Sequence, residues 1–193
     1  MDIESLINPE EIEELARRYG PIQRGSYSVE MGREQFEYWH DKLTTKCRGE
    51  VVLVVEYPNG VVLHTKDFYP PGIYRLPSGG VKWDESVLHA LHREAHEEMN
   101  LQIEIKRCLG ILEYEFCCGE EKLPFVSYIF LVEGDKKELA AQDHEEHIVS
   151  FRRVPATELP AVADSLRRLG GNWKDWGQFR ALAHDFVAEV MGG

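Results

Sequence analysis

The chain has 193 residues, of which 43% are hydrophobic and 29% are charged, a composition typical of a folded globular protein and not of a disordered one. Its formal net charge is −12 and it contains no Lys/Arg-rich stretch, so we do not expect a general nucleic-acid-binding protein. No apolar run has the length of a membrane span, and the acidic N-terminus lacks the pattern of a signal peptide. We therefore expect a cytoplasmic protein without a membrane partner.

The four cysteines form neither a disulfide pattern nor a zinc pattern. Cys117 and Cys118 are adjacent, Cys47 and Cys108 stand alone, and no C-x-x-C pair occurs. We therefore expect buried free thiols.

The first 46 residues differ in pattern from the rest of the chain. Residues 10–19 and 32–43 carry apolar residues at helical spacing and predict two helices, with a loop or a short strand at 21–30 between them. We expect residues 1–46 to form a helical N-terminal extension. It could pack as a lid or as the contact surface of a homodimer, and the sequence does not decide between these two roles.

From residue 49 the pattern becomes that of strands separated by turns. The elements expected here are, in chain order, a buried strand at 50–57, a hairpin turn at 58–60, the returning strand at 61–68, a short strand and glycine turn at 73–80, a helix at 85–99, an extended segment at 103–116, a connection at 120–124, strands at 125–134 and 147–154, and a helical turn from 156.

The last part of the chain predicts an amphipathic helix at 173–190, because apolar residues recur there at spacings of three and four. The order of helices, hairpin, helix, strands and helix predicts an α+β fold with a mixed or antiparallel sheet. We expect a central domain at 47–162 and a C-terminal helical segment at 163–193 that packs on the same domain.

Residues 76–101, LPSGGVKWDESVLHALHREAHEEMNL, contain the most informative pattern. On a helix, Glu94, Glu97 and Glu98 stand at i, i+3 and i+4, so their carboxylates converge on one patch beside an apolar stripe. Near a core edge their mutual repulsion grows, and a bound divalent cation offsets it. Hard oxygen ligands of this kind suit Mg²⁺ or Mn²⁺.

The alternative to a metal site is an acidic helix in solvent. Two basic neighbours, Lys82 and Arg93, are not spaced to neutralise all three acids. Gly79 and Gly80 precede the helix and allow a ligand to approach the backbone closely, and a helix N-terminus offers free N–H groups to anions. An ordinary strand-to-helix turn is the alternative explanation of these glycines.

Taken together, these residues resemble the Nudix box, G-x(5)-E-x(7)-R-E-U-x-E-E-x-G-U, where U is a bulky aliphatic residue. The resemblance extends from Gly79 to Leu101, and every charged position of the box is filled. The departures are Ala95 at a U position, Asn100 in place of the second glycine, and Asp84 where many members have glycine. Asn tolerates the left-handed conformation of a helix C-cap, so the change at 100 is mild.

The resemblance implies the Nudix fold, a mixed β-sheet sandwiched between helices (α/β/α), and a hydrolase that uses Mg²⁺ or Mn²⁺. The catalytic residues it implies are Glu94, Glu98, Arg93 and Glu85, and the metal ligands are Glu94, Glu97, Glu98, Gly79 through its carbonyl, and Glu146.

Within this set, Arg93 resembles the arginine that orients the catalytic glutamate by a charge-assisted hydrogen bond. Glu85 resembles the auxiliary acid, and either Glu94 or Glu98 deprotonates the attacking water. The ligand outside the box is Glu146 or its neighbour Glu145, with an acidic turn as the alternative.

The implied reaction is attack of water on a phosphorus atom of a nucleoside diphosphate linked to another group. Motifs that mark the ADP-ribose, NADH and coenzyme A enzymes are absent: position 116 is Phe116, and Pro124 comes too late. The substrate is therefore not identified. A regulatory module that binds a nucleotide without cleaving it is the alternative, although none of the box glutamates is lost. Isomerisation would need an added cysteine, for which Cys117 and Cys118 are weak candidates.

Outside the charged positions of the box, a few residues are candidates for substrate contact. These are Gly80, Arg152 and Arg153 for a phosphate, and Trp173 and Trp176 for a base. The structural alternative is that the tryptophans anchor the terminal helix and the arginines lie on an edge strand. His92 and His96 have a spacing that suits zinc, but no third ligand is evident.

Overall fold

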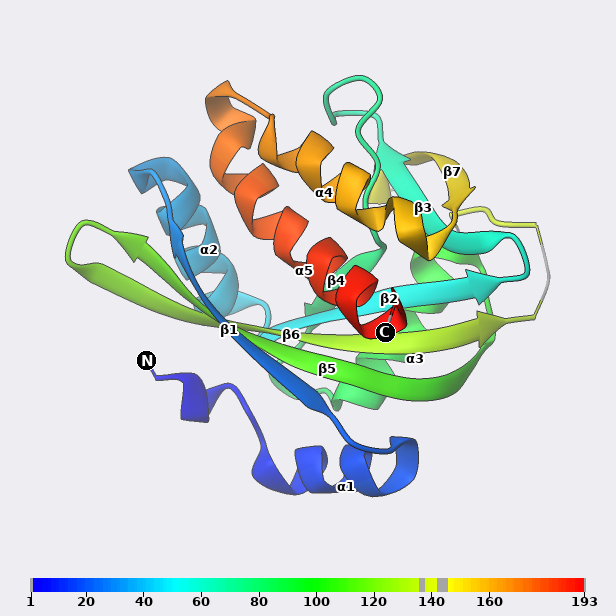
Figure 1. Cartoon of the computed structure of the whole chain (residues 1–193). Coiled ribbons are helices and arrows are strands. Elements are labelled where there is room, and N and C mark those ends of the chain that lie inside the picture. The colour runs from blue at the N-terminus through cyan, green and yellow to red at the C-terminus, as the bar shows by residue number, and fades with distance from the viewer. Residues whose placement is uncertain (1, 136–137, 142–145, 193) are drawn as a thin grey trace.

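The computed structural model describes residues 2–135, 138–141 and 146–192. Within these residues the strands form one seven-stranded sheet of order β1-β5-β6-β2-β3-β7, and β4 pairs with β2 outside this path. Figure 1 shows helices α2, α4 and α5 over one face of the sheet and helices α1 and α3 over the other. The predicted α+β fold, a mixed sheet between helices, is confirmed.

The N-terminal segment contains both helices and a strand. Helix α1 (Pro9–Tyr19) begins with proline and is capped by Asn8, whose side chain accepts hydrogen bonds from the first free N–H groups. A short 3₁₀ turn (Ile3–Ser5) precedes it. Strand β1 (Gln23–Glu30) pairs in parallel with β5 at the sheet edge. Of the two alternatives for residues 21–30, a loop or a short strand, the structure has the strand, at residues 23–30. The division of the chain into three segments stays a prediction.

Helix α2 (Arg33–Thr45) leads into the buried centre of the sheet. Strand β2 (Gly49–Tyr57) has seven successive buried residues because helices cover it on both faces. It is parallel to β6 (Glu121–Gly134) and antiparallel to β3 (Gly60–Lys66) and β4 (Ser78–Val81), so the sheet is mixed. Strand β7 (Ile148–Val154) pairs with β3 at the other edge.

Two expected boundaries differ from the structure. Residues 120–124 were expected to connect two extended segments, but Gly119, with φ of 62°, allows a tight turn and β6 begins at 121, opposite the end of β5 (Ile103–Cys118). The helix expected at 85–99 is α3 (Val87–Met99), because the Ser86 side chain caps it by accepting a hydrogen bond from the His89 N–H.

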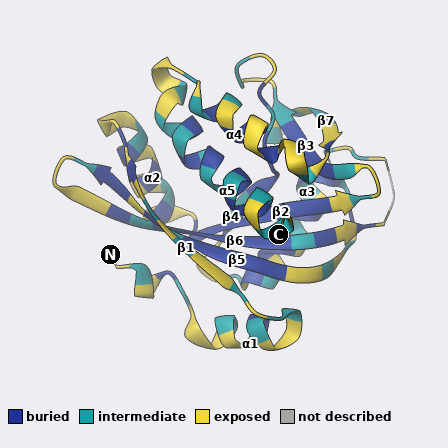
Figure 2. Ribbon diagram, in the orientation of Figure 1, coloured by how far each residue is buried: buried dark blue, intermediate teal, exposed yellow. Residues whose placement is uncertain are grey.

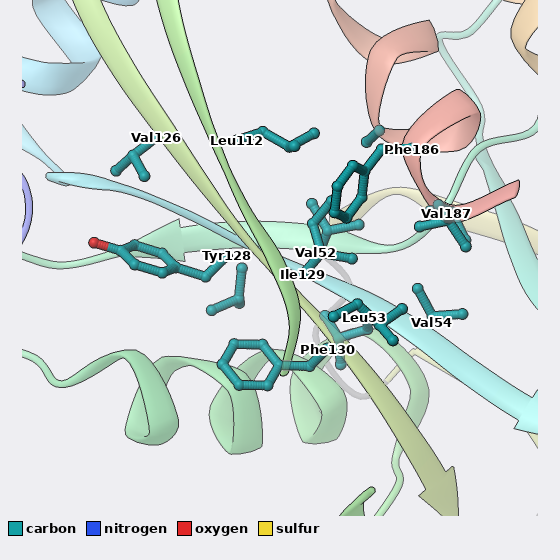
Figure 3. Packing of buried hydrophobic residues seen from close by; sticks show 14 of the residues in the cluster. Val52, Leu53, Val54, Leu112, Val126, Tyr128, Ile129, Phe130, Phe186 and Val187 are labelled. Atoms are coloured by element: carbon teal, nitrogen blue, oxygen red, sulfur yellow. The ribbon is translucent and has the colours of Figure 1, made fainter. Parts of the chain in front are cut away.

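The C-terminal segment is helical. A 3₁₀ turn (Ala156–Glu158), helix α4 (Leu159–Arg167), a second turn (Gly171–Trp173) and helix α5 (Lys174–Gly192) follow β7. Figure 2 shows that the buried residues line the sheet and the inner faces of the helices. In Figure 3, Phe186 and Val187 of α5 approach one face of the strands and Phe130 points to the face covered by α3.

Two further observations bear on the sequence predictions. The four cysteines are free thiols, and Cys118 is the one that is partly exposed. Among the described residues, no helix combines the length and the apolar character needed to cross a membrane.

Candidate active site

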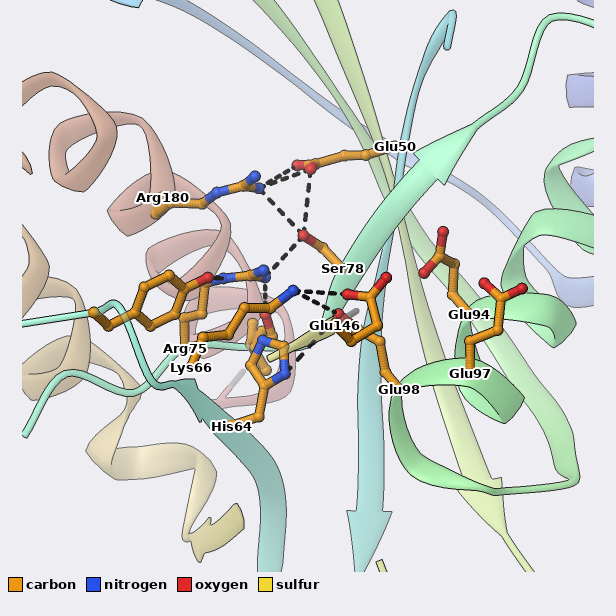
Figure 4. A network of polar contacts seen from close by, with 12 residues as sticks. Glu50, His64, Lys66, Arg75, Ser78, Glu94, Glu97, Glu98, Glu146 and Arg180 are labelled. Carbon is orange, nitrogen blue, oxygen red and sulfur yellow. Dashed lines mark hydrogen bonds and ion pairs between the residues drawn. The ribbon is translucent and has the colours of Figure 1, made fainter. Parts of the chain in front are cut away.

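The three glutamates of α3 differ strongly in exposure. Glu98 is fully buried, Glu94 is 5% exposed, and the side chain of Glu97 is 35% exposed. Figure 4 shows the three carboxylates projecting from α3 toward the same region, with Glu146 beside Glu98. The helix therefore brings the predicted ligands together on one patch, with Glu98 at its buried end.

The carboxylate of Glu98 is buried without a hydrogen bond to either oxygen among the described residues. Lys66 Nζ lies 3.7 Å from one of its oxygens, and Nδ1 of His64, whose pKa burial holds well below the ordinary value, lies 4.0 Å away. Burial raises the pKa of Glu98 to about 8, although Arg75 and Lys66 act to lower it. Because its two oxygens have no hydrogen-bond partner among the described residues, the Glu98 carboxyl group is suited to binding a cation.

Glu94 lies against the backbone of Gly79. A β-carbon at position 79 would overlap the Glu94 carboxyl group, so only glycine fits beside this side chain. Burial raises the pKa of Glu94 despite the nearby Arg93 guanidinium, whose Nη1 donates a hydrogen bond to Oε1 at 2.7 Å. Gly79 and Glu94 together form a close backbone–carboxylate contact in front of α3.

Arg93 holds the acidic residues of the site in place. Its Nε and Nη2 donate to the two carboxylate oxygens of Glu85, each at 2.8 Å, and its Nη1 also donates to Glu97 at 2.8 Å. Its Nη2 donates in addition to the Gly80 carbonyl. Burial acts to raise the pKa of Glu85, but the hydrogen bonds from Arg93, the Lys82 N–H and His89, together with the Arg93 charge, outweigh it and lower that pKa to about 2. Arg93 thus contacts Glu85, Glu94 and Glu97, and its orienting role stays a prediction.

Glu146 lies beside Glu98 in the same patch (Figure 4). Its carboxylate accepts a hydrogen bond from Lys66 Nζ at 2.7 Å, and its charge raises the pKa of Glu98 and of Glu94. The alternative ligand, Glu145, lies outside the described residues. Glu146 therefore stays the candidate for the ligand beyond α3.

The residues of the patch fit a divalent cation. Within the described ranges, no three His, Cys, Asp or Glu side chains already stand in a metal-holding arrangement. However, the Glu98 oxygens have no hydrogen-bond partner, and burial and neighbouring carboxylates raise the pKa values of Glu94 and Glu98, so a cation bound between these side chains would stabilise their ionised forms. Hard oxygen donors of this kind favour Mg²⁺ or Mn²⁺.

Comparison with known families shows to which family the chain belongs. A sequence model of the NUDIX domain matches residues 46–176, which is more than half of the chain. The chain belongs to the Nudix family. The match includes the whole box from Gly79 to Leu101 and confirms the predicted Nudix-type enzyme of the pyrophosphohydrolase class. No curated protein matches the sequence.

Several solved structures are similar to this Nudix chain. An ADP-ribose pyrophosphatase from Streptococcus suis is 16% identical with a TM-score of 0.46, and the match covers 75% of this chain and 91% of that one. The Escherichia coli dihydroneopterin triphosphate pyrophosphohydrolase is 14% identical with a TM-score of 0.48, covering 77% and 98%. An Ap4A hydrolase from Caenorhabditis elegans is 16% identical with a TM-score of 0.45, covering 75% and 99%.

A second polar cluster lies beside the Nudix box, and the sequence analysis missed it. The buried Glu50 on β2 accepts two hydrogen bonds from Arg180 Nη1, at 2.9 and 2.7 Å, and one from Ser127 Oγ at 2.8 Å. Ser78 donates to Glu50 and accepts from both Arg180 and Arg75 (Figure 4). The sequence contained one indication of this cluster, because Glu50 begins an apolar strand and a buried charge requires a partner.

The remaining candidates for substrate contact are Arg152, Arg153 and Gly80. Arg152 and Arg153 are on β7, where their guanidinium groups lie over the rings of Tyr74 and Tyr57, at 4.4 and 4.0 Å from the ring centroids. This agrees with the edge-strand alternative, and a phosphate contact by either arginine stays a prediction. Gly80 contributes its carbonyl to Arg93.

Proposed function

We propose that this Nudix protein is a divalent-metal-dependent hydrolase. It cleaves the diphosphate linkage of a nucleoside diphosphate linked to another moiety, by attack of water on phosphorus. The observation that carries this proposal is the buried carboxylate of Glu98, which has no hydrogen-bond partner among the described residues and shares a patch with Glu94. Without a cation, burial keeps the Glu98 carboxyl group protonated up to a pH of about 8, whereas a bound cation would stabilise its ionised form.

The residues that would hold Mg²⁺ or Mn²⁺ are Glu94, Glu97, Glu98, Glu146 and the Gly79 carbonyl. When bound, such an ion polarises phosphate oxygens and lowers the pKa of water. The burial of Glu94 and Glu98 supports a dry site, in which charge interactions are stronger than in water.

Each polar residue around this patch has a distinct task in the proposed reaction. Arg93 fixes the carboxylates of Glu94 and Glu97, and Glu85 fixes Arg93 through two parallel hydrogen bonds. Either Glu94 or Glu98 accepts the proton of the attacking water, because burial raises the pKa of both and so increases their basicity.

The test is a panel of ADP-sugars, UDP-sugars, dinucleotides and dinucleoside polyphosphates, assayed with Mg²⁺ or Mn²⁺ by the release of nucleoside monophosphate. We expect turnover of at least one compound class and its loss in EDTA. Glu97→Gln should abolish turnover and keep the fold, since Glu97 is partly exposed. The matched control is Glu14→Gln on the exposed face of α1, which should retain wild-type turnover.

Two outcomes would contradict the proposal. One is near-normal turnover in Glu97→Gln. The other is silence across the panel together with tight binding of one nucleotide, which would indicate the regulatory module instead of an enzyme.

A further inference from the structure

An aromatic cavity opens next to the proposed catalytic patch. It has a volume of about 330 Å³ and lies between helix α2, the turn after β3 and the start of helix α5. Its lining consists of Gln35, Tyr38, Trp39, Phe68, Asn172, Trp173, Trp176 and Arg180. We call this set the aromatic cavity. Its volume is at the lower end of small-molecule sites in proteins.

Two rings of this cavity, those of Tyr38 and Phe68, are open to solvent. Tyr38 is 54% exposed and Phe68 is 53% exposed, and they are two of the four large hydrophobic residues that stand exposed in the described part of the chain. Phe68 and Trp173 have nearly parallel rings, with an interplanar angle of 15° and centroids 6.4 Å apart. Leaving such rings exposed is unfavourable in water, so a planar apolar ligand that covers them gains free energy.

Two polar groups in the wall of the cavity lack partners. Trp39 Nε1 and Arg180 Nε are buried and make no hydrogen bond within the described residues. Trp39 is 1% exposed and the side chain of Arg180 is 10% exposed, so each N–H is costly to leave unpaired. Both groups are donors only, and because both atoms are closed off from solvent, a ligand in the cavity contacts the rings and not these N–H groups. Gln35 and Asn172 add amide groups to the same lining.

The aromatic cavity is linked directly to the catalytic patch. Arg180 Nη1 donates to Ser78 Oγ at 3.3 Å, and the next residue, Gly79, contacts the Glu94 carboxylate. Figure 4 shows Ser78 between Arg180 and the glutamates of α3. In the binding mode that we infer, one nucleotide places its base in the cavity and its diphosphate at the glutamates.

We infer that the aromatic cavity binds the nucleobase of the substrate, by stacking on its exposed rings beside the amide side chains of Gln35 and Asn172. This inference rests on the proposed function for the identity of the substrate as a nucleotide. Several of the residues that form the cavity lie outside the matched NUDIX segment, namely Gln35, Tyr38, Trp39 and Arg180. The base site is thus built largely by this chain's own terminal segments.

The test measures binding without turnover. AMP, GMP, CMP and UMP are titrated in EDTA, with ribose 5-phosphate as the probe that lacks a base. Three of the four tryptophans line the cavity, so quenching of their fluorescence reports binding, and calorimetry gives the Kd. We expect at least one nucleoside monophosphate to bind tenfold or more tightly than ribose 5-phosphate.

The variants Phe68→Ala and Trp173→Ala should each weaken that binding about tenfold, the size of effect typical of one lost base–aromatic stack. The control is Val149→Ala, which removes an exposed apolar side chain outside the cavity and should bind within twofold of wild type. If a substrate is found, both cavity variants should raise KM with little change in kcat. Unaltered thermal melting shows that the variants remain folded.

The inference is overturned if no monophosphate binds more tightly than ribose 5-phosphate, or if both cavity variants bind like wild type. Because the titration is done in EDTA, its result does not depend on hydrolysis. Base binding without any turnover would support the base site in the aromatic cavity and contradict the proposed hydrolase. Turnover without base selectivity would support the hydrolase and contradict the base site.

Discussion

The Gly79 backbone lies so close to the Glu94 carboxylate that position 79 has no room for a β-carbon. Gly79→Ala should therefore displace Glu94 and lower kcat/KM about 100-fold, because small shifts of catalytic groups are costly. Overpacking should also lower the free energy of unfolding by about 1–3 kcal/mol. Steady-state assays and urea denaturation check both effects.

The matched control for this prediction is Gly170→Ala. No atom lies within 4 Å of a β-carbon built there, and the backbone φ of −118° suits any residue. We expect wild-type activity and stability from it. Normal turnover in Gly79→Ala would show that the Glu94 position is not critical.

Arg93 joins Glu85, Glu94 and Glu97 through hydrogen bonds in a fixed fork, which lysine cannot reproduce. We expect Arg93→Lys to lower the free energy of unfolding by about 1–3 kcal/mol and to reduce kcat more than it changes KM. The exposed pair between Arg18 and Glu14 is the control, since Arg18→Lys should change stability by less than about 1 kcal/mol. Equal effects of the two substitutions would contradict the orienting role of Arg93.

The sequence was sufficient to predict the features that depend on local spacing. The positions of Glu94, Glu97 and Glu98 on one helix follow from its period, and Asn100 adopts the left-handed C-cap conformation, with φ of 54°, that was expected of it. The contact of Arg93 with Glu97 also follows from i, i+4 spacing.

Features that depend on distant parts of the chain were not predicted. Glu50 and Arg180 are separated by 130 positions, so no local pattern connects them. The difference between Glu97, which is partly exposed, and Glu98, which is fully buried, depends on which strands pack against α3. The parallel pairing of β1 with β5 could likewise not be predicted from the sequence, because its register is set by the folded sheet.

Glu98 is expected to reduce stability in the absence of a metal. Its pKa is raised by burial to about 8, so the folded state holds a proton that the unfolded state releases above its ordinary pKa of 4.5. Stability is therefore lost as pH rises from about 4.5 to about 8. Glu98→Gln removes this effect, and in EDTA it should be more stable than wild type by about 5 kcal/mol at pH 8.5, and by much less at pH 5.

The same substitution should eliminate metal-dependent turnover and the rise of Tm that Mg²⁺ or Mn²⁺ gives the wild type. Urea denaturation in EDTA at the two pH values, with thermal melts at increasing metal concentration, tests both parts. A variant less stable than wild type at pH 8.5 would mean that the Glu98 carboxylate has a stabilising partner when no metal is bound.

His184 connects α5 to the segment before β4 in its neutral form. Its Nε2 accepts a hydrogen bond from the Leu76 N–H at 3.0 Å, and its Nδ1 donates to the Arg180 carbonyl at 2.9 Å. Burial lowers the pKa of His184 to about 4, although the hydrogen bond to Arg180 acts to raise it. Between about pH 6.5 and 4 the unfolded chain therefore binds a proton that the folded chain does not, and stability falls as the pH is lowered through this window.

The folded and unfolded pKa values of His184 differ by about 2.5, which corresponds to about 3 kcal/mol in the free energy of unfolding. His184→Gln removes this dependence of stability on pH. At pH 7 the wild type should be more stable than this variant, because glutamine does not reproduce both hydrogen bonds. At pH 4 that advantage should be about 3 kcal/mol smaller. The exposed His40 provides the control, since His40→Gln should keep the pH dependence of the wild type. A stability difference between wild type and His184→Gln that stays constant from pH 7 to 4 would mean that His184 is protonated in the folded protein, and that the contact with Leu76 does not depend on its neutral form.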